Sequence, residues 1–257
     1  MNLPAISGNL HGRSVDLLWS LEMRLNRIIL GWLFVAGLAA AVRIESNRLE
    51  TSLGADGLPP YLLLVVAPIA CILLALRWFA DGERSPQPSF RIAQVGRWRT
   101  LSADEVTTHP LYGTTGIMFS LLVGMLLNIP VRAGEYLLAM PAISGPVPPW
   151  LSVLHTMMTI DVVLLSSLYG IAFVAALRKL PLFPRLLVAV WMIDIAMQLL
   201  IAQMVAATPG LPGSVAQALQ SLLAGNLNKV LISAALWLPY LLLSTRVKVT
   251  YRRRIPA

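Results

Sequence analysis

Residues 233–254 decide the fold of this chain, where Ser233-Ala-Ala-Leu-Trp-Leu-Pro-Tyr-Leu-Leu-Leu-Ser244 runs directly into Thr245-Arg-Val-Lys-Val-Thr-Tyr-Arg-Arg-Arg254. An apolar segment followed by a dense basic segment is typical of a membrane-spanning helix that ends at the cytoplasmic face, because short cytoplasmic segments are enriched in Lys and Arg. The orientation of this last helix sets the orientation of each helix before it.

The composition of the whole chain predicts the same class of protein. Of its 257 residues, 57% are hydrophobic and 12% are charged, whereas about 25% of the residues in soluble domains are charged. The mean hydropathy is +0.72. Apolar runs recur along the sequence at close to the roughly 20 residues that a spanning helix needs. We therefore expect an all-α, polytopic membrane protein with six transmembrane helices.

The expected spans are residues 28–42, 61–80, 113–131, 151–177, 186–206 and 230–245. Residues 14–27 form an amphipathic pattern, which fits either a helix lying on the cytoplasmic leaflet or a cytoplasmic extension of the first span. Ser214 is the expected N-cap of a short surface helix between the last two spans.

The distribution of basic residues predicts the orientation of the spans. All but four of the 20 Lys and Arg residues fall in the N-terminal segment, the second connection, the fourth connection or the C-terminal tail; the four are Arg43, Arg48, Arg132 and Lys229. This asymmetry places both termini in the cytoplasm. It also accounts for the net charge of +8 without nucleic acid as a partner.

The one long polar stretch, residues 81–112, predicts a cytoplasmic linker between two units. Residues 1–80 hold the amphipathic helix and two transmembrane helices, and residues 113–257 hold a four-helix unit with the basic tail. Within the linker, Ser102-Ala-Asp-Glu105 fits the capping box of a short helix.

The final helix and tail also resemble a known family. Trp237-Leu-Pro-Tyr240 followed by Ser244-Thr-Arg-Val-Lys-Val-Thr-Tyr251 is similar to the C-terminal signature of the YdgK-like bacterial inner-membrane proteins, and residues 179–184 match a basic Leu-Phe-Pro-type turn of that family. The resemblance covers about residues 113–251, although the unit opens with Gly113-Thr-Thr-Gly116 instead of a Gly-Gly-Trp-Leu-like start. It implies a four-helix inner-membrane unit of unknown activity.

Two carboxylates inside apolar spans are the candidate functional residues, because a charge in the bilayer costs at least a few kcal/mol. Asp161 and Asp194 both fall near the midplane, with no Lys or Arg expected at that depth. Burial then favours protonated carboxyls. Asp194 is expected to stack with Gln198 one turn later. The candidate polar network comprises Asp161, Asp194, Gln198, Gln203, Ser166, Ser167 and Tyr169.

This network has two interpretations. Protonated carboxyls can hydrogen-bond between helices as packing contacts, which favours a non-catalytic subunit or scaffold of a larger membrane assembly, with a membrane-protein partner or a second copy. Alternatively, Asp161 and Asp194 line the path of a small proton-coupled transporter or channel. An enzyme is disfavoured because no catalytic motif, phosphate loop or paired cysteine is present. We expect no cofactor and no metal site.

Basic and aromatic residues predict anchoring to anionic lipid headgroups at the membrane surface. The expected anchors are Arg246, Lys248, Arg252, Arg253, Arg254, Trp98 and Trp150.

Overall fold

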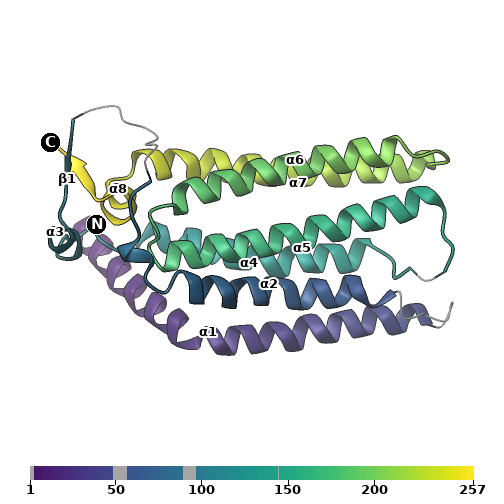
Figure 1. Cartoon of the computed structure of the whole chain (residues 1–257), viewed down its shortest axis with the longest axis horizontal. Helices are drawn as coiled ribbons and strands as arrows, with labels where there is room; N and C mark the ends of the chain where they lie inside the picture. Colours follow the sequence, from purple (N-terminus) through teal and green to yellow (C-terminus); the bar gives the residue numbers. More distant parts are fainter. Residues whose placement is uncertain (1–2, 49–56, 89–96, 144) are drawn as a thin grey trace.

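The computed structural model describes residues 3–48, 57–88, 97–143 and 145–257. Within these ranges, six helices are long and apolar enough to cross a membrane, which confirms the predicted fold class. They lie side by side in one bundle (Figure 1). Their bounds are Leu3–Arg48 for α1, Pro59–Trp78 for α2, Ile117–Ala139 for α4, Pro149–Leu177 for α5, Phe183–Ala206 for α6 and Gly213–Leu243 for α7.

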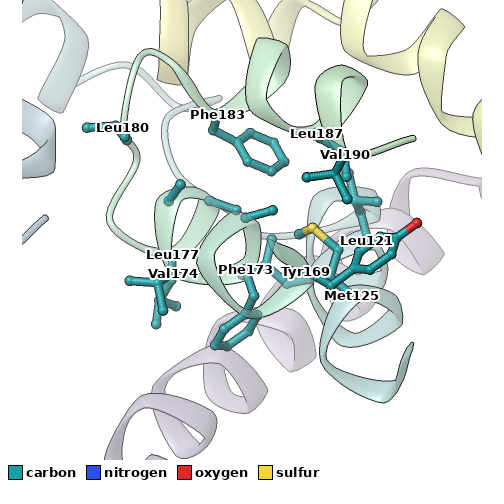
Figure 2. Close-up of a cluster of buried hydrophobic side chains, with 14 of the residues drawn as sticks. Leu121, Met125, Tyr169, Phe173, Val174, Leu177, Leu180, Phe183, Leu187 and Val190 are labelled. Atoms are coloured by element: carbon teal, nitrogen blue, oxygen red, sulfur yellow. The ribbon is translucent and has the colours of Figure 1, made fainter. Parts of the chain in front are cut away.

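Helix α5 is the centre of the bundle. It packs against α2, α4 and α6. Of the residues in the most apolar 18-residue stretch of α5, 72% are buried, whereas the same share is 11% for α1 and 11% for α7. Gly170 permits the close contact with α2, because a Cβ there would lie 2.9 Å from Ile72 Cγ1. Figure 2 shows the main core, to which α5 contributes Phe173 and α6 contributes Phe183 and Leu187, all three fully buried.

Three helices continue well past a boundary that the sequence predicted. Helix α1 continues from the amphipathic segment into the first span, so the extension interpretation holds. Leu25 of that segment is buried, and Leu18 and Leu21 pack against the main core. Helix α4 passes through Pro130 to Ala139, and α7 includes both the expected surface helix and the last span. A proline inside a transmembrane helix bends the backbone without ending it, because neighbouring groups satisfy the freed carbonyl.

A small cap covers the end of the bundle where the C-terminus lies (Figure 1). Helix α8, Thr245–Arg252, turns back from α7, and strand β2, Arg254–Pro256, pairs antiparallel with β1, Trp98–Thr100. Next to β1, helix α3, Ala103–Thr107, begins with the predicted Ser102–Glu105 capping box, which is confirmed. The 3-10 helix η2, Gly82–Arg84, follows α2 at this end. Residues 89–96 of the predicted linker lie outside the described ranges.

Candidate functional site

Arg132 lies inside the bundle because α4 continues past Pro130. Its Nη1 donates a hydrogen bond to Asp161 Oδ2 of α5 at 3.0 Å, and its Nη2 forms an ion pair with Asp194 Oδ2 of α6. Its Nε donates to Asn128 Oδ1, one turn earlier on α4, at 3.1 Å. One guanidinium therefore joins three transmembrane helices.

Polar side chains extend this contact to a fourth helix. Gln198 Nε2 donates to Asp161 Oδ1 at 3.0 Å, and Tyr169 OH donates to Asp194 Oδ2 at 3.1 Å. Asn226 Nδ2 of α7 donates to Gln198 Oε1 at 3.4 Å. We refer to Arg132, Asp161, Asp194, Gln198 and Tyr169 as the charge cluster. Asp161 and Asp194 are buried, with exposed fractions of 4% and 0%.

The expectation that no cation reaches these carboxylates is wrong. Asn128-Ile-Pro130 resembles a helix end, so the predicted span stops at residue 131 and Arg132 falls in a loop, whereas α4 continues to Ala139. The i, i+4 spacing of Asn128 and Arg132 was a signal that the helix continues. Gln198, one turn after Asp194 on α6, also bonds to Asp161 of α5, so the charge cluster is formed between helices.

The remaining residues of the predicted network lie elsewhere. Ser166 and Ser167 are buried in α5, and Gln203 is exposed on α6. Within the described ranges, none of the three hydrogen-bonds to the charge cluster, and Ser166 Oγ has no partner. His155 contacts a separate pair: Tyr136 OH lies 3.3 Å from its Nε2 and 2.7 Å from Thr159 Oγ1.

The charge cluster is bordered by two cavities between α4 and α7, of about 140 Å³ and 450 Å³. The smaller extends toward Trp191 and Trp237, and the larger toward Met158 and Leu222. Both are lined by Arg132, Glu135, Asn226 and Lys229. We call the two cavities together the α4–α7 groove.

An ion pair crosses this groove. Lys229 of α7 bonds to Glu135 of α4, and their side chains are 60% and 44% exposed. The groove is therefore open to the molecular surface between these helices. If Asp161 and Asp194 are both ionised, they exceed the charge of Arg132 by one negative charge. Among the described residues, Asp194 Oδ1 receives no hydrogen bond, so this surplus lies on a buried and incompletely solvated group.

Within the described ranges, no group of three or more His, Cys, Asp or Glu side chains is placed to hold a metal ion. The charge cluster offers hydrogen bonding, charge pairing and proton binding by its carboxylates.

The predicted lipid anchors are largely engaged with the protein itself. Lys248 Nζ and Arg254 Cζ lie 4.3 and 4.9 Å from the centre of the Trp98 ring. Arg246 donates to Thr115 Oγ1 at 2.7 Å, and Arg253 bonds to the Glu83 carbonyl. Arg252 Nη2 lies 3.4 Å from the Leu241 carbonyl, and Trp150 packs against a second core cluster.

Comparison with known families places these features in a domain. A family model described as "Protein of unknown function (DUF2569)" matches residues 115–252. The chain belongs to this family. The DUF2569 region begins just before α4 and ends in α8, so it contains the charge cluster and excludes α1 and α2. No curated protein and no solved structure matches the chain significantly.

Proposed function

We propose that this DUF2569 protein is a non-catalytic subunit or scaffold of a larger membrane assembly, and that its α4–α7 groove receives a transmembrane helix of a partner. The observation that carries the proposal is the groove itself, which presents charged and amide side chains on a surface between two spanning helices. Arg132, Glu135 and Asn226 already bond to other side chains of the bundle. Lipid chains offer no polar group to this surface, so a helix with polar side chains suits it better than lipid does.

The groove also has room for a helix to approach. Gly124 of α4 and Gly225 of α7 line it, and a Cβ added at either position would meet open space. Small residues of this kind permit close contact between transmembrane helices. The surplus negative charge of the cluster favours a partner helix that carries a basic residue or a hydrogen-bond donor.

The second candidate is a small proton-coupled transporter or channel. It is favoured by the two cavities that border the charge cluster, both of which are lined by Lys229 and Glu135. In this case water fills the groove, and Asp161 or Asp194 binds the transported proton or cation.

The same proposal includes the membrane in which the protein lies, its orientation and its division into two units. We place the protein in a bacterial inner membrane, within the YdgK-like branch of the family, with both termini in the cytoplasm. The ending of the sequence and the distribution of Lys and Arg support this placement. Residues 1–80 are proposed as an accessory two-helix unit, joined by the linker 81–112 to the four-helix unit 113–257.

Thiol labelling in the groove separates the two functions. Cys71 is the one cysteine of the chain, so Cys71→Ala gives a background for Gly124→Cys and Gly225→Cys. A charged, membrane-impermeant thiol reagent is applied first to everted and right-side-out vesicles of the native membrane and then to the purified protein. Gly37→Cys on α1, where a Cβ also meets open space, is the matched control outside the groove.

If a partner helix occupies the groove, the introduced cysteines should be protected from the reagent in the native membrane and should react with it after purification. Extraction with a mild detergent should then recover a partner bound to the chain. A water-filled groove gives cysteines that react in both preparations. In that case, proton-dependent flux in liposomes that is abolished by Asp161→Asn and Asp194→Asn would replace the scaffold by the transporter.

A further inference from the structure

A second polar cavity lies outside the spanning part of the bundle, where α6 begins and α8 meets β2. Its volume is about 70 Å³. Arg185 of α6, Arg252 of α8 and Arg254 of β2 line it together with Trp98 and Thr100 of β1. The cavity is unrelated to the α4–α7 groove, with which it shares no lining residue.

The charges around this cavity are all of one sign. None of its nine described lining residues is acidic, and Lys248 lies over the same Trp98 ring as Arg254. Burial, together with the charges of Arg254 and Arg185, lowers the pKa of Arg252 to about 10. Burial and the charges of Arg254 and Arg252 also lower the pKa of Lys248. Neighbouring like charges disfavour each other's charged form, and an anion bound between them would offset this repulsion.

Nearby acidic residues are engaged elsewhere. Glu83 forms an ion pair with Lys179, and Glu105 pairs with Arg99 at 2.8 Å. The first turn of α6 offers no free donor in place of the arginines, because Phe183 N donates to Leu180 O at 2.9 Å and Arg185 N donates to Leu182 O at 3.0 Å. An anion in the cavity would therefore be held by guanidinium groups.

We propose that the cavity formed by Arg185, Arg252 and Arg254 binds one phosphate group, supplied by the headgroup of an anionic membrane lipid or by a soluble phosphate. Guanidinium forks match the spacing of phosphate oxygens and can each form two parallel hydrogen bonds. The volume suits a group of a few heavy atoms and excludes a nucleotide. The cavity also lies where α6 begins and α7 ends, which is the depth of lipid headgroups.

The test uses the full chain purified in detergent. Thermal unfolding is followed with phosphatidylglycerol against phosphatidylcholine, and with sodium phosphate against sodium chloride at equal ionic strength. The site variant is Arg185→Gln with Arg252→Gln. The matched control is Arg84→Gln with Arg178→Gln, which removes two exposed arginines at the same end of the bundle. Arg185→Lys with Arg252→Lys keeps the charge and removes the forks.

We expect phosphatidylglycerol or phosphate to raise the melting temperature of the wild type and of the control variant. In the glutamine variant, the apparent affinity should fall about tenfold for each guanidinium removed, since a hydrogen bond to a charged group contributes about one such factor. A shift with phosphatidylglycerol alone identifies a lipid, and a shift with phosphate alone identifies a soluble ligand. If neither probe shifts the wild type, or if a shift is unchanged in both site variants, the proposal is wrong.

Discussion

Arg132 of α4 and Asp161 of α5 are joined by a 3.0 Å hydrogen-bonded ion pair inside the bundle. The exposed fractions of their side chains are 11% and 6%, so the pair is shielded from solvent. Because Arg132 also pairs with Asp194, each acid depends on the same cation, and the three helices are fixed in one register. A buried ion pair contributes most clearly to such specificity, since the desolvation of its charges offsets much of their attraction.

Replacing Arg132 by Met should be more destabilising than replacing either acid by Asn. The variant leaves Asp161 and Asp194 buried without their cation, and loss of one partner of a buried pair costs about 3 to 5 kcal/mol. Adding Asp194→Asn should recover part of this loss. The free energy of unfolding in mixed detergent measures both effects. Lys229→Met is the control, because its pair with Glu135 is exposed and worth about 1 kcal/mol or less. Equal losses for Arg132→Met and Lys229→Met would contradict the role of the charge cluster.

Gly170→Ala should destabilise the contact between α2 and α5. The added Cβ would lie 2.9 Å from Ile72 Cγ1, and overpacking of this kind costs about 1 to 3 kcal/mol. The double variant Gly170→Ala with Ile72→Ala removes the clashing atoms and should be less destabilised than the sum of its single variants predicts. Gly124→Ala, where a Cβ meets no atom within 4 Å, serves as control. A wild-type melting curve for Gly170→Ala would show that the two helices are farther apart.

Tyr251 attaches the C-terminal cap to the bundle. Its ring lies 4.9 Å from that of Phe183, and its OH donates to the Ala176 carbonyl at 3.0 Å. Tyr251→Phe should cost about 1 kcal/mol, because it removes the hydrogen bond of the hydroxyl, although the Ala176 carbonyl keeps its bond from Lys179 N. Tyr251→Ala should cost about 3 to 5 kcal/mol and expose the tail. Limited proteolysis with trypsin tests this result, since α8 and β2 contain many cleavage sites that the fold protects.

The ion pair of Lys179 and Glu83 should make the cap sensitive to acid. Burial raises the pKa of Glu83, but the hydrogen bonds of Lys179 and Tyr112 and the charges of Lys179 and Arg253 together lower it more, so the net shift is downward from 4.5. A carboxyl with a lowered pKa stabilises the fold above its ordinary pKa and loses that contribution as pH falls through the folded value. When the pH is lowered from 7 to 3, the melting temperature of the wild type should therefore decrease more steeply than that of Lys179→Gln. Parallel curves would exclude the pair as their cause, and Arg178→Gln is the matched control.

The six spans could be predicted from the sequence because each is a run of apolar residues, a signal contained within the segment itself. The Ser102–Glu105 capping box is equally local. The acids of the charge cluster could be found for the same reason, since a carboxylate inside an apolar run is conspicuous. Arg132 was missed because Pro130, just before it, matches a helix end in soluble proteins, whereas a spanning helix can continue through proline.

The C-terminal tail shows a different limit. Its basic residues predict headgroup contact when each is considered alone, but Lys248 and Arg254 lie against Trp98, more than 140 residues away in the sequence. Such contacts depend on how α8 folds back over α6, which no local pattern encodes. The phosphate cavity was missed for the same reason, because Arg185 joins the tail only through the tertiary fold.

The orientation of the bundle gives the last prediction. Reporter fusions after residues 48, 90, 140, 181 and 211 should lie alternately outside and inside, beginning outside, with both termini in the cytoplasm. The final fusion belongs at residue 211, in the connection between α6 and α7, because residues further on lie within α7. Two of the four basic residues expected outside are paired with acids, because Arg132 bonds to Asp194 inside the bundle and Lys229 bonds to Glu135. Arg43 bonds to the Met140 carbonyl at 2.9 Å. A cytoplasmic reporter at residue 140 would invert the bundle and place the basic cap, with its phosphate cavity, on the outer face.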